Sequence, residues 1–294
     1  MYEDLRSSTV FSPESMGELV NYKQKHPQAL FWAGGTYLMA KEVNYPSKNP
    51  INIISLGKMD ELKRITRNDT SVEFGSMASI QTVTAIARNF FSKDICNALN
   101  ATSTQLIRRM ATIGGALCTQ KIKTSFTTIM MTLDANIECR IVGKKPLTKW
   151  IQLDNMFDKS GSLVLSPSTL ITRLHINADK DSIFYFKETG SPMTQSDYSV
   201  VFAMRSRLLQ NSITETRACF NFPSIGLHLS EAVQSSLTGV VLPMNPVRII
   251  RLTEALVNEI RMEHPALRPI QVEQASRMFE SYLYDLNAKV IARS

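Results

Sequence analysis

The sequence of 294 residues predicts an α+β fold, and two kinds of pattern predict this class. Short apolar runs bounded by polar or glycine-containing turns are typical of strands, whereas longer segments with apolar residues three and four positions apart are typical of amphipathic helices. Both kinds occur along the whole chain, without an internal repeat or a low-complexity segment. With 44% hydrophobic residues, the chain is able to bury the core of two domains or of one elaborated domain.

The first expected helix begins at Ser12-Pro13, a capping hydroxyl followed by proline at the first helical position, and covers about residues 13–25. The run Leu30–Ala33 is too short for a helix and leads into Gly34-Gly35, which predicts a strand that enters a glycine turn. The further elements expected up to residue 101 are strands at 51–56 and 71–75, a helix capped by Ser79, and a helix at 93–101.

A second glycine pair, Gly114-Gly115, follows about eighty residues after the first. The elements expected after it are strands at 135–142, 170–176, 182–187 and 217–222 and amphipathic helices at 246–260 and 271–292, the helices being separated by Pro265 and Pro269. We expect a first domain over residues 1–180, built of subdomains of about 1–56 and 57–180. A smaller α+β domain is expected over residues 181–294.

Composition argues against several classes of protein. No apolar run approaches the roughly eighteen residues that span a bilayer, and the segment Met1–Leu5 carries acidic residues where a signal peptide has basic ones, so we expect a cytoplasmic protein without a membrane anchor. The formal charge of +7 is spread along the chain, and the densest groups, Arg108-Arg109 and Lys121-Ile122-Lys123, favour a solvated basic surface over a nucleic-acid site.

Cysteine and histidine are too scattered to form a recognisable metal motif. There is no C-x-x-C pair, and the residues concerned are Cys96, Cys118, Cys139, Cys219, His26, His175, His228 and His264. We therefore expect neither a zinc site nor an iron–sulfur cluster within this chain.

The two glycine pairs are consistent with two functions, ligand binding and chain reversal. A glycine pair after a strand lets the backbone approach a ligand, and its N–H groups can face phosphate oxygens such as those of a dinucleotide, but the same pair also serves plain chain reversal. Neither pair fits the G-x-G-x-x-G fingerprint or the phosphate loop with G-K-[ST], so a Rossmann or P-loop site is not predicted.

Both segments resemble the flavin loops of one family. Ala33-Gly34-Gly35-Thr36-Tyr37-Leu38 resembles the first loop, A-G-G-T-x-L, of the FAD-binding subunits of molybdenum hydroxylases, the xanthine dehydrogenase and carbon monoxide dehydrogenase flavoprotein family. The segment 107–115, IRRMATIGG, resembles their second loop, I-R-N-x-A-T-I-G-G. Further similar segments are Glu73–Ser76, Leu133–Ala135, Phe186-Lys187, and Phe222-Pro223 through Gly239, so the resemblance extends over nearly the whole chain.

The resemblance implies a two-subdomain PCMH-type FAD-binding domain followed by a smaller α+β C-terminal domain. It implies FAD as the cofactor, with the two loops around its pyrophosphate. The cofactor-binding residues implied or suggested in this way are Ala33, Gly34, Gly35, Thr36, Tyr37, Leu38, Arg108, Thr112, Ile113, Gly114, Gly115, Ser125 and Lys187.

The resemblance also implies an electron-transfer subunit without catalytic residues for the substrate reaction. The flavin would receive electrons from a small partner subunit with 2Fe-2S clusters, which receives them from a molybdopterin-binding large subunit, and would pass them to NAD or another acceptor. The sequence does not identify that acceptor or the substrate.

Four positions depart from the family pattern: Ala116 replaces an asparagine, Ser125 an aspartate, Tyr37 a small or acidic residue, and Ser191 an arginine. Backbone contacts to the pyrophosphate survive these changes, whereas each lost side-chain hydrogen bond costs about 0.5–1.5 kcal/mol. A scaffold subunit that keeps the fold with weakened or lost FAD binding is therefore the alternative function.

For several side chains in the loops, both a structural role and a ligand-binding role are possible interpretations. Arg108 is expected either to contact a phosphate or partner or to form a surface ion pair. Thr36 and Thr112 donate either to phosphate oxygens or to the turn itself. Trp32 and Tyr37 belong either to the core or to a stacking platform for an aromatic ring.

Overall fold

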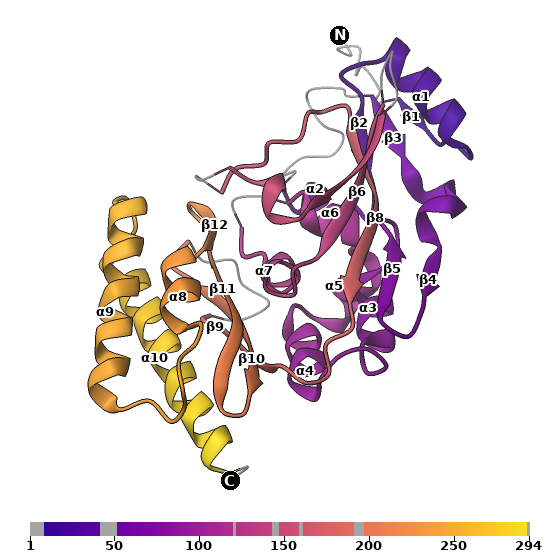
Figure 1. Ribbon diagram of the computed structural model, residues 1–294. Coiled ribbons are helices and arrows are strands. Elements are labelled where there is room, and N and C mark those ends of the chain that lie inside the picture. The colour runs from indigo at the N-terminus through magenta and orange to yellow at the C-terminus, as the bar shows by residue number, and fades with distance from the viewer. Residues whose placement is uncertain are drawn as a thin grey trace.

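The computed structural model describes residues 9–41, 52–119, 122–142, 147–158, 161–190 and 197–292. Within these residues the strands form three sheets, and the chain passes from the first to the third in sequence order. Figure 1 shows the N-terminal sheet at one end of the molecule and the helices α9 and α10 at the other.

The first sheet is small and parallel. It consists of β1 (Val10–Phe11), β2 (Leu30–Trp32) and β3 (Ile53–Ser55) in the order β1-β3-β2, accompanied by α1 (Met16–Lys25) and α2 (Thr36–Lys41). The predicted start of the first helix at residue 13 is wrong. Ser15, rather than Ser12, is the N-cap, because its side chain accepts a hydrogen bond from the Glu18 amide at 3.3 Å.

The second sheet is antiparallel and has the strand order β4-β5-β8-β6-β7. Its strands are β4 (Ile65–Arg67), β5 (Ser71–Gly75), β6 (Asn136–Ile141), β7 (Leu147–Gln152) and β8 (Thr169–Asn177). The helices of this part are α3 (Ile80–Ala87), α4 (Lys93–Ala101), α5 (Gln105–Met110), α6 (Ile113–Leu117) and α7 (Ser125–Thr132). Ser79 caps α3 as predicted, and α4 has the predicted bounds.

The third sheet is antiparallel, with the order β12-β11-β10-β9. Its strands are β9 (Ile183–Glu188), β10 (Val201–Leu209), β11 (Ser212–Phe222) and β12 (Gly226–Leu229), followed by α8 (Glu231–Leu237), α9 (Pro246–Glu263) and α10 (Pro269–Ile291). The last helix begins at Pro269 rather than at residue 271, since proline is tolerated in the first turn of a helix. Among the described residues, no helix combines the length and apolar character needed to cross a bilayer.

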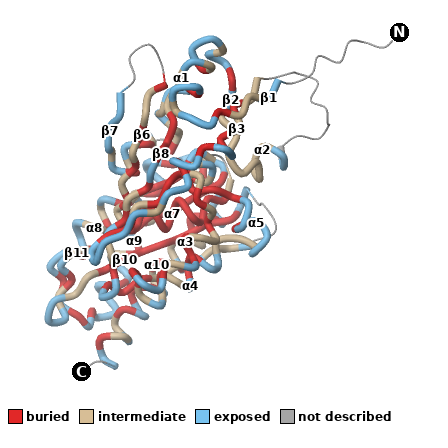
Figure 2. Tube along the Cα trace, turned by 90° about the vertical axis from the view of Figure 1, so that its right-hand side faces the viewer, coloured by how far each residue is buried: buried red, intermediate tan, exposed pale blue. Residues whose placement is uncertain are grey.

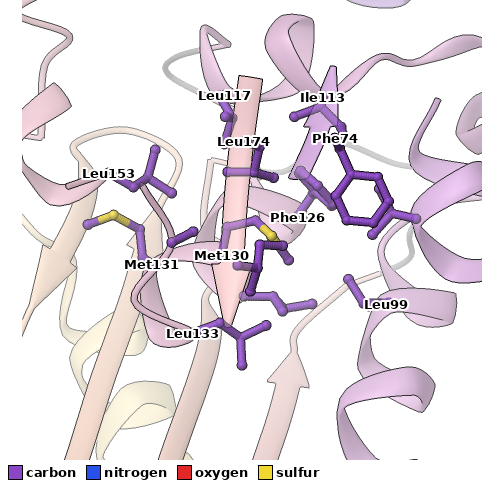
Figure 3. Close-up of a cluster of buried hydrophobic side chains, with 14 of the residues drawn as sticks. Phe74, Leu99, Ile113, Leu117, Phe126, Met130, Met131, Leu133, Leu153 and Leu174 are labelled. Carbon is purple, nitrogen blue, oxygen red and sulfur yellow. The ribbon is translucent and has the colours of Figure 1, made fainter. Parts of the chain in front are cut away.

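Helix α7 joins the second and third sheets. All eight of its residues are buried, and its core cluster contains Phe74 of β5 and Leu174 of β8 as well as Ala203 and Cys219 of the third sheet. Figure 3 shows Met130 and Met131 beside Leu174 in this cluster, and Figure 2 shows buried positions running through the middle of the molecule. A continuous apolar core therefore holds the two antiparallel sheets together.

The other face of the third sheet packs against α9 and α10, on the side away from α7 (Figure 1). Phe202 of β10 stacks on Phe220 of β11, with ring centroids 4.5 Å apart and an interplanar angle of 18°. Phe279 and Tyr282 of α10 meet the Phe202 ring edge-on at 6.4 and 6.5 Å. Phe202 is thus the centre of the C-terminal core.

Substitution of Phe202 by alanine should destabilise the chain by about 3–5 kcal/mol, because it removes a fully buried ring with four aromatic neighbours, which are Tyr185, Phe220, Phe279 and Tyr282. Leu209→Ala on the same strand is the control, since Leu209 is 67% exposed and should change stability by less than about 0.5 kcal/mol. Urea unfolding of both variants gives the comparison. Equal midpoints would show that this aromatic cluster does not stabilise the domain.

Candidate functional site

The two glycine loops lie in contact with each other. A Cβ atom on Gly34 would lie 2.0 Å from the Met110 carbonyl oxygen and 3.3 Å from Ala111 Cα, and one on Gly115 would lie 3.9 Å from Ala33 Cβ. The loop after β2 therefore packs backbone to backbone on the junction between α5 and α6, which also places α2 near α6 (Figure 1). Only glycine permits this approach at position 34.

The first loop is a strand-to-helix turn. Gly35 has a φ of +69°, and a Cβ there would lie 2.7 Å from Cζ2 of the Trp32 ring, so both backbone conformation and space favour glycine. Helix α2 follows at once, with the Met39 amide donating to the Gly35 carbonyl at 2.9 Å. Within the residues that the structure describes, the amides of Gly34, Gly35 and Thr36 and the Thr36 hydroxyl make no hydrogen bond. These groups are available to a ligand.

The second glycine pair is the first turn of a short helix rather than a chain reversal. Thr112 caps α6, and its hydroxyl oxygen accepts from the Gly115 amide at 3.3 Å. The Ile113 amide donates to the Ala78 carbonyl at 3.0 Å, and the Gly114 amide donates to the Ser76 carbonyl at 2.8 Å. The expectation of free amides in this glycine pair is therefore wrong, because the amides of Gly114 and Gly115 both have partners within the chain.

The segment 76–78 is the part of the site whose role the sequence does not reveal. A Cβ on Gly114 would lie 3.1 Å from Ser76 Cβ, so this glycine serves the close approach of α6 to the segment after β5. The family resemblance at Glu73–Ser76 identified this segment but did not predict its contact with α6. Gly115 is the exposed member of the pair and lies next to Ala33.

Arg108 has a structural role. Its side chain turns inward from α5, where Nη1 donates to the Asn100 and Ser103 carbonyls and Nε lies 3.4 Å from Oε1 of Gln81. Arg108 is buried, and these partners tie the turn between α4 and α5 to α3. Nε and Nη1 are thus occupied inside the protein, and among the described residues Arg108 forms no ion pair, whereas its contact with a phosphate stays a prediction.

Ser125 and Lys187 do not face a common point. The buried Ser125 hydroxyl donates to Glu188 Oε2 at 2.6 Å, and Lys123 Nζ lies 3.3 Å from the other oxygen of the same carboxylate. Successive side chains of a strand point to opposite faces, so Lys187, which is exposed, is directed away from Ser125. Ser191 lies outside the described residues.

The remaining predicted residues take ordinary places around the two loops. Ala33, Tyr37 and Leu38 are half-buried, whereas the Ile113 side chain is fully buried in the central core. Trp32 covers the backbone at Gly35, so its ring supports the loop. The fold thus brings together residues 33–38 and 112–115. The side chains of Arg108 and Ser125 are bonded to other parts of the chain, and Lys187 is exposed.

The sequence matches a known protein family and known relatives. The family described as FAD binding domain in molybdopterin dehydrogenase matches residues 5–177. The FAD subunit of nicotinate dehydrogenase from Eubacterium barkeri is 30% identical over 152 residues, which are 50% of this chain and 48% of that protein. Aldehyde oxidase 2 from Cavia porcellus is 24% identical over 219 residues, which are 70% of this chain and 16% of that protein. The aligned region thus spans at most about half the length of these relatives.

Two solved structures share the fold over nearly the whole chain. Quinoline 2-oxidoreductase from Pseudomonas putida 86 superposes with a TM-score of 0.77 at 16% identity, covering 98% of this chain and 99% of that one. Carbon monoxide dehydrogenase from Hydrogenophaga pseudoflava superposes with a TM-score of 0.78 at 15% identity, covering 95% and 96%. These likenesses confirm the predicted fold class.

Substitution of Gly34 by alanine should destabilise the chain by about 1–3 kcal/mol, because the new methyl group would meet the Met110 carbonyl at 2.0 Å and force the loops apart. Gly17→Ala is the matched control, because a Cβ there would meet no atom closer than 4.0 Å and alanine favours helix α1. Thermal unfolding measured by circular dichroism distinguishes the two. A Gly34→Ala variant as stable as the control would rule out the loop contact.

Proposed function

Because the chain belongs to the family of FAD-binding domains of molybdopterin dehydrogenases, we propose that it is an electron-transfer subunit that holds FAD between its two glycine loops. The family match over residues 5–177 supports FAD as the cofactor. The close approach of Gly34 to Met110 supports a binding site between the two glycine loops. We further propose that residues 1–180, with subdomains of about 1–56 and 57–180, form the FAD-binding domain and that residues 181–294 form the C-terminal domain.

The observation that carries the proposal is the set of free donors in the first loop. The amides of Gly34, Gly35 and Thr36 and the Thr36 hydroxyl are unpaired in the described structure and lie at the start of α2. Helix starts favour negative charge, and a diphosphate offers several oxygen acceptors to such donors. These residues fit the pyrophosphate of FAD, and the exposed Gly115 would border it from the second loop.

The other residues proposed to contact FAD would do so through their backbone or through half-buried side chains. Ala33, Tyr37 and Leu38 would line the first loop beside the cofactor, and Thr112 would shape the second loop through its cap on Gly115. Lys187 stays a proposed contact because its side chain is exposed. Ser125 would act indirectly, since its hydroxyl is held by Glu188.

The proposal includes partners that this chain does not contain. When bound, FAD would supply a group able to exchange electrons singly or in pairs, which suits a link between one-electron and two-electron carriers. We propose a 2Fe-2S small subunit as the electron donor, a molybdopterin-binding large subunit as the place of substrate chemistry, and NAD or another oxidant as the acceptor. The FAD-subunit name of the nicotinate dehydrogenase relative supports such an assembly.

A scaffold subunit without functional FAD is the second candidate, and specific contacts favour it. The amides of Ile113 and Gly114 are already bonded to Ala78 and Ser76, and the Ser125 hydroxyl is bonded to Glu188. Ala116 adds no polar side chain. In this case the second loop would serve only the packing of α6.

Titration of the apo chain with FAD should quench the flavin fluorescence in a saturable way. Thr36→Val should raise the Kd about 10- to 150-fold, because it removes a hydroxyl that donates to a charged phosphate oxygen. Thr66→Val, an exposed position on strand β4, is the matched control and should leave the Kd unchanged.

The titration separates the two candidate functions. Saturable quenching that weakens with Thr36→Val but not with Thr66→Val supports the flavin subunit. Absence of quenching, both for the isolated chain and for the chain co-purified with its native partner subunits, rejects it in favour of the scaffold.

A further inference from the structure

Two histidines far apart in the sequence meet at the C-terminal end of α9. His228 lies on β12, Glu263 is the last residue of α9, and His264 is the C-cap of that helix. His228 Nδ1 lies 3.2 Å from His264 Nε2 and 3.3 Å from Glu263 Oε2. One ligand atom from each residue lies within 4.8 Å of the other two.

These distances suit a tetrahedral metal ion. Zinc binds imidazole nitrogen and carboxylate oxygen at about 2.0–2.2 Å, so two ligands of one tetrahedral ion are separated by about 3.3–3.5 Å. The two printed separations from His228 Nδ1 are close to this value. We propose that His228, Glu263 and His264 bind a divalent transition-metal ion of the zinc class, with water as the fourth ligand.

The surroundings favour a cation. The last turn of α9 carries the partial negative charge of a helix C-terminus, and Glu259 and Glu263 add two carboxylates on the same side of the helix. The Phe220 and Phe222 rings lie 6.3 Å from the His228 and His264 rings respectively and provide apolar cover.

Glu259 supplies an outer partner for the site. His228 is 4% exposed, and its Nε2 atom is buried without a hydrogen-bond partner among the described residues. The nearest carboxylate oxygen, Glu259 Oε2, is 3.9 Å away, and Glu259 is itself held by the Ser230 hydroxyl and by the Ala232 amide at 3.3 Å. A metal-bound histidine normally directs its second nitrogen at such a carboxylate.

A hydrogen bond between the two imidazoles alone leaves the tautomer of His228 open. If His228 Nδ1 donates to His264, Nε2 becomes a buried acceptor that faces the Glu259 carboxylate, another acceptor. A metal on Nδ1 fixes the proton on Nε2, where it faces Glu259. A metal ion thus holds His228 in the tautomer that directs its Nε2 proton toward Glu259.

The same residues indicate how a metal ion would enter the site and what it would stabilise. The Glu263 side chain is 55% exposed, so it can exchange water for an arriving ion, whereas both histidines are buried. The ion would tie the edge strand β12 to the end of α9, and no residue of the glycine loops belongs to this site. The expectation of no zinc site rested on the absence of a C-x-x-C pair and on the scatter of cysteines and histidines along the sequence. The fold brings two of these histidines, 36 residues apart, into contact.

The test uses the full chain, stripped of metal with a chelator and titrated with Zn²⁺ alone by calorimetry. Co²⁺ is used in parallel, because its visible absorption reports tetrahedral coordination. The variants are Glu263→Gln and His264→Gln, which remove ligands at the helix end, and Glu259→Gln, which changes only the outer carboxylate. Glu254→Gln, an exposed position on the same helix, is the control.

The proposal expects one Zn²⁺ per chain, a tetrahedral Co²⁺ spectrum, and a melting temperature that rises with the metal. Glu259→Gln should weaken binding about 10- to 100-fold, the ligand variants should weaken it further, and Glu254→Gln should not change it. Wild-type binding no tighter than that of Glu263→Gln and His264→Gln, with both variants folded, would overturn the proposal. FAD titration of the same samples is independent of this result, because the two sites share no residue.

Discussion

The contact between the backbone at Gly34 and the carbonyl of Met110 is the constraint on which the candidate site depends. It requires a residue without a side chain, and it joins the loop after β2 of the first sheet to the junction between α5 and α6. Because Gly34 rests on this junction, α2 begins beside α6 and its first amides stay unpaired in the described structure. Gly34 was expected to let the backbone approach a ligand, but its missing side chain instead lets the backbone approach the neighbouring loop. This packing leaves the amides at the start of α2 unpaired, so they can donate to a ligand.

The remainder of the chain holds this junction in place. The buried helix α7 follows α6 and packs on β10 and β11, while the Arg217 side chain of β11 binds Asp134 Oδ1 at 3.1 Å, Asp154 Oδ2 at 2.9 Å and the Met131 carbonyl at 2.8 Å. The buried ion pair of Lys123 and Glu188 adds a second polar link between the segment before α7 and β9. The third sheet therefore packs against α7 and the segment before it, and the proposed metal site would stabilise the outer edge of this sheet at β12.

Local signals allowed much of the fold to be predicted. The cap at Ser79, the helix at 93–101 and the pairing of two glycine segments each depend on residues close in sequence, or on a resemblance to whole motifs. The start of α1 was missed because Ser12 and Ser15 offer similar caps, and only the bond to Glu18 decides between them. The inward turn of Arg108, the occupied amide of Gly114 and the meeting of His228 with His264 all depend on contacts between distant segments, which spacing along the chain does not encode.

Amide hydrogen exchange, resolved by residue with nuclear magnetic resonance, tests the central claim most directly. Without FAD, the amides of Ile113 and Gly114 should already be protected by their bonds to Ala78 and Ser76, whereas those of Gly34, Gly35 and Thr36 should exchange fast. Saturating FAD should slow exchange at these three amides and leave Ile113 and Gly114 nearly unchanged. Exchange at Gly34, Gly35 and Thr36 that is identical with and without bound FAD would contradict the account.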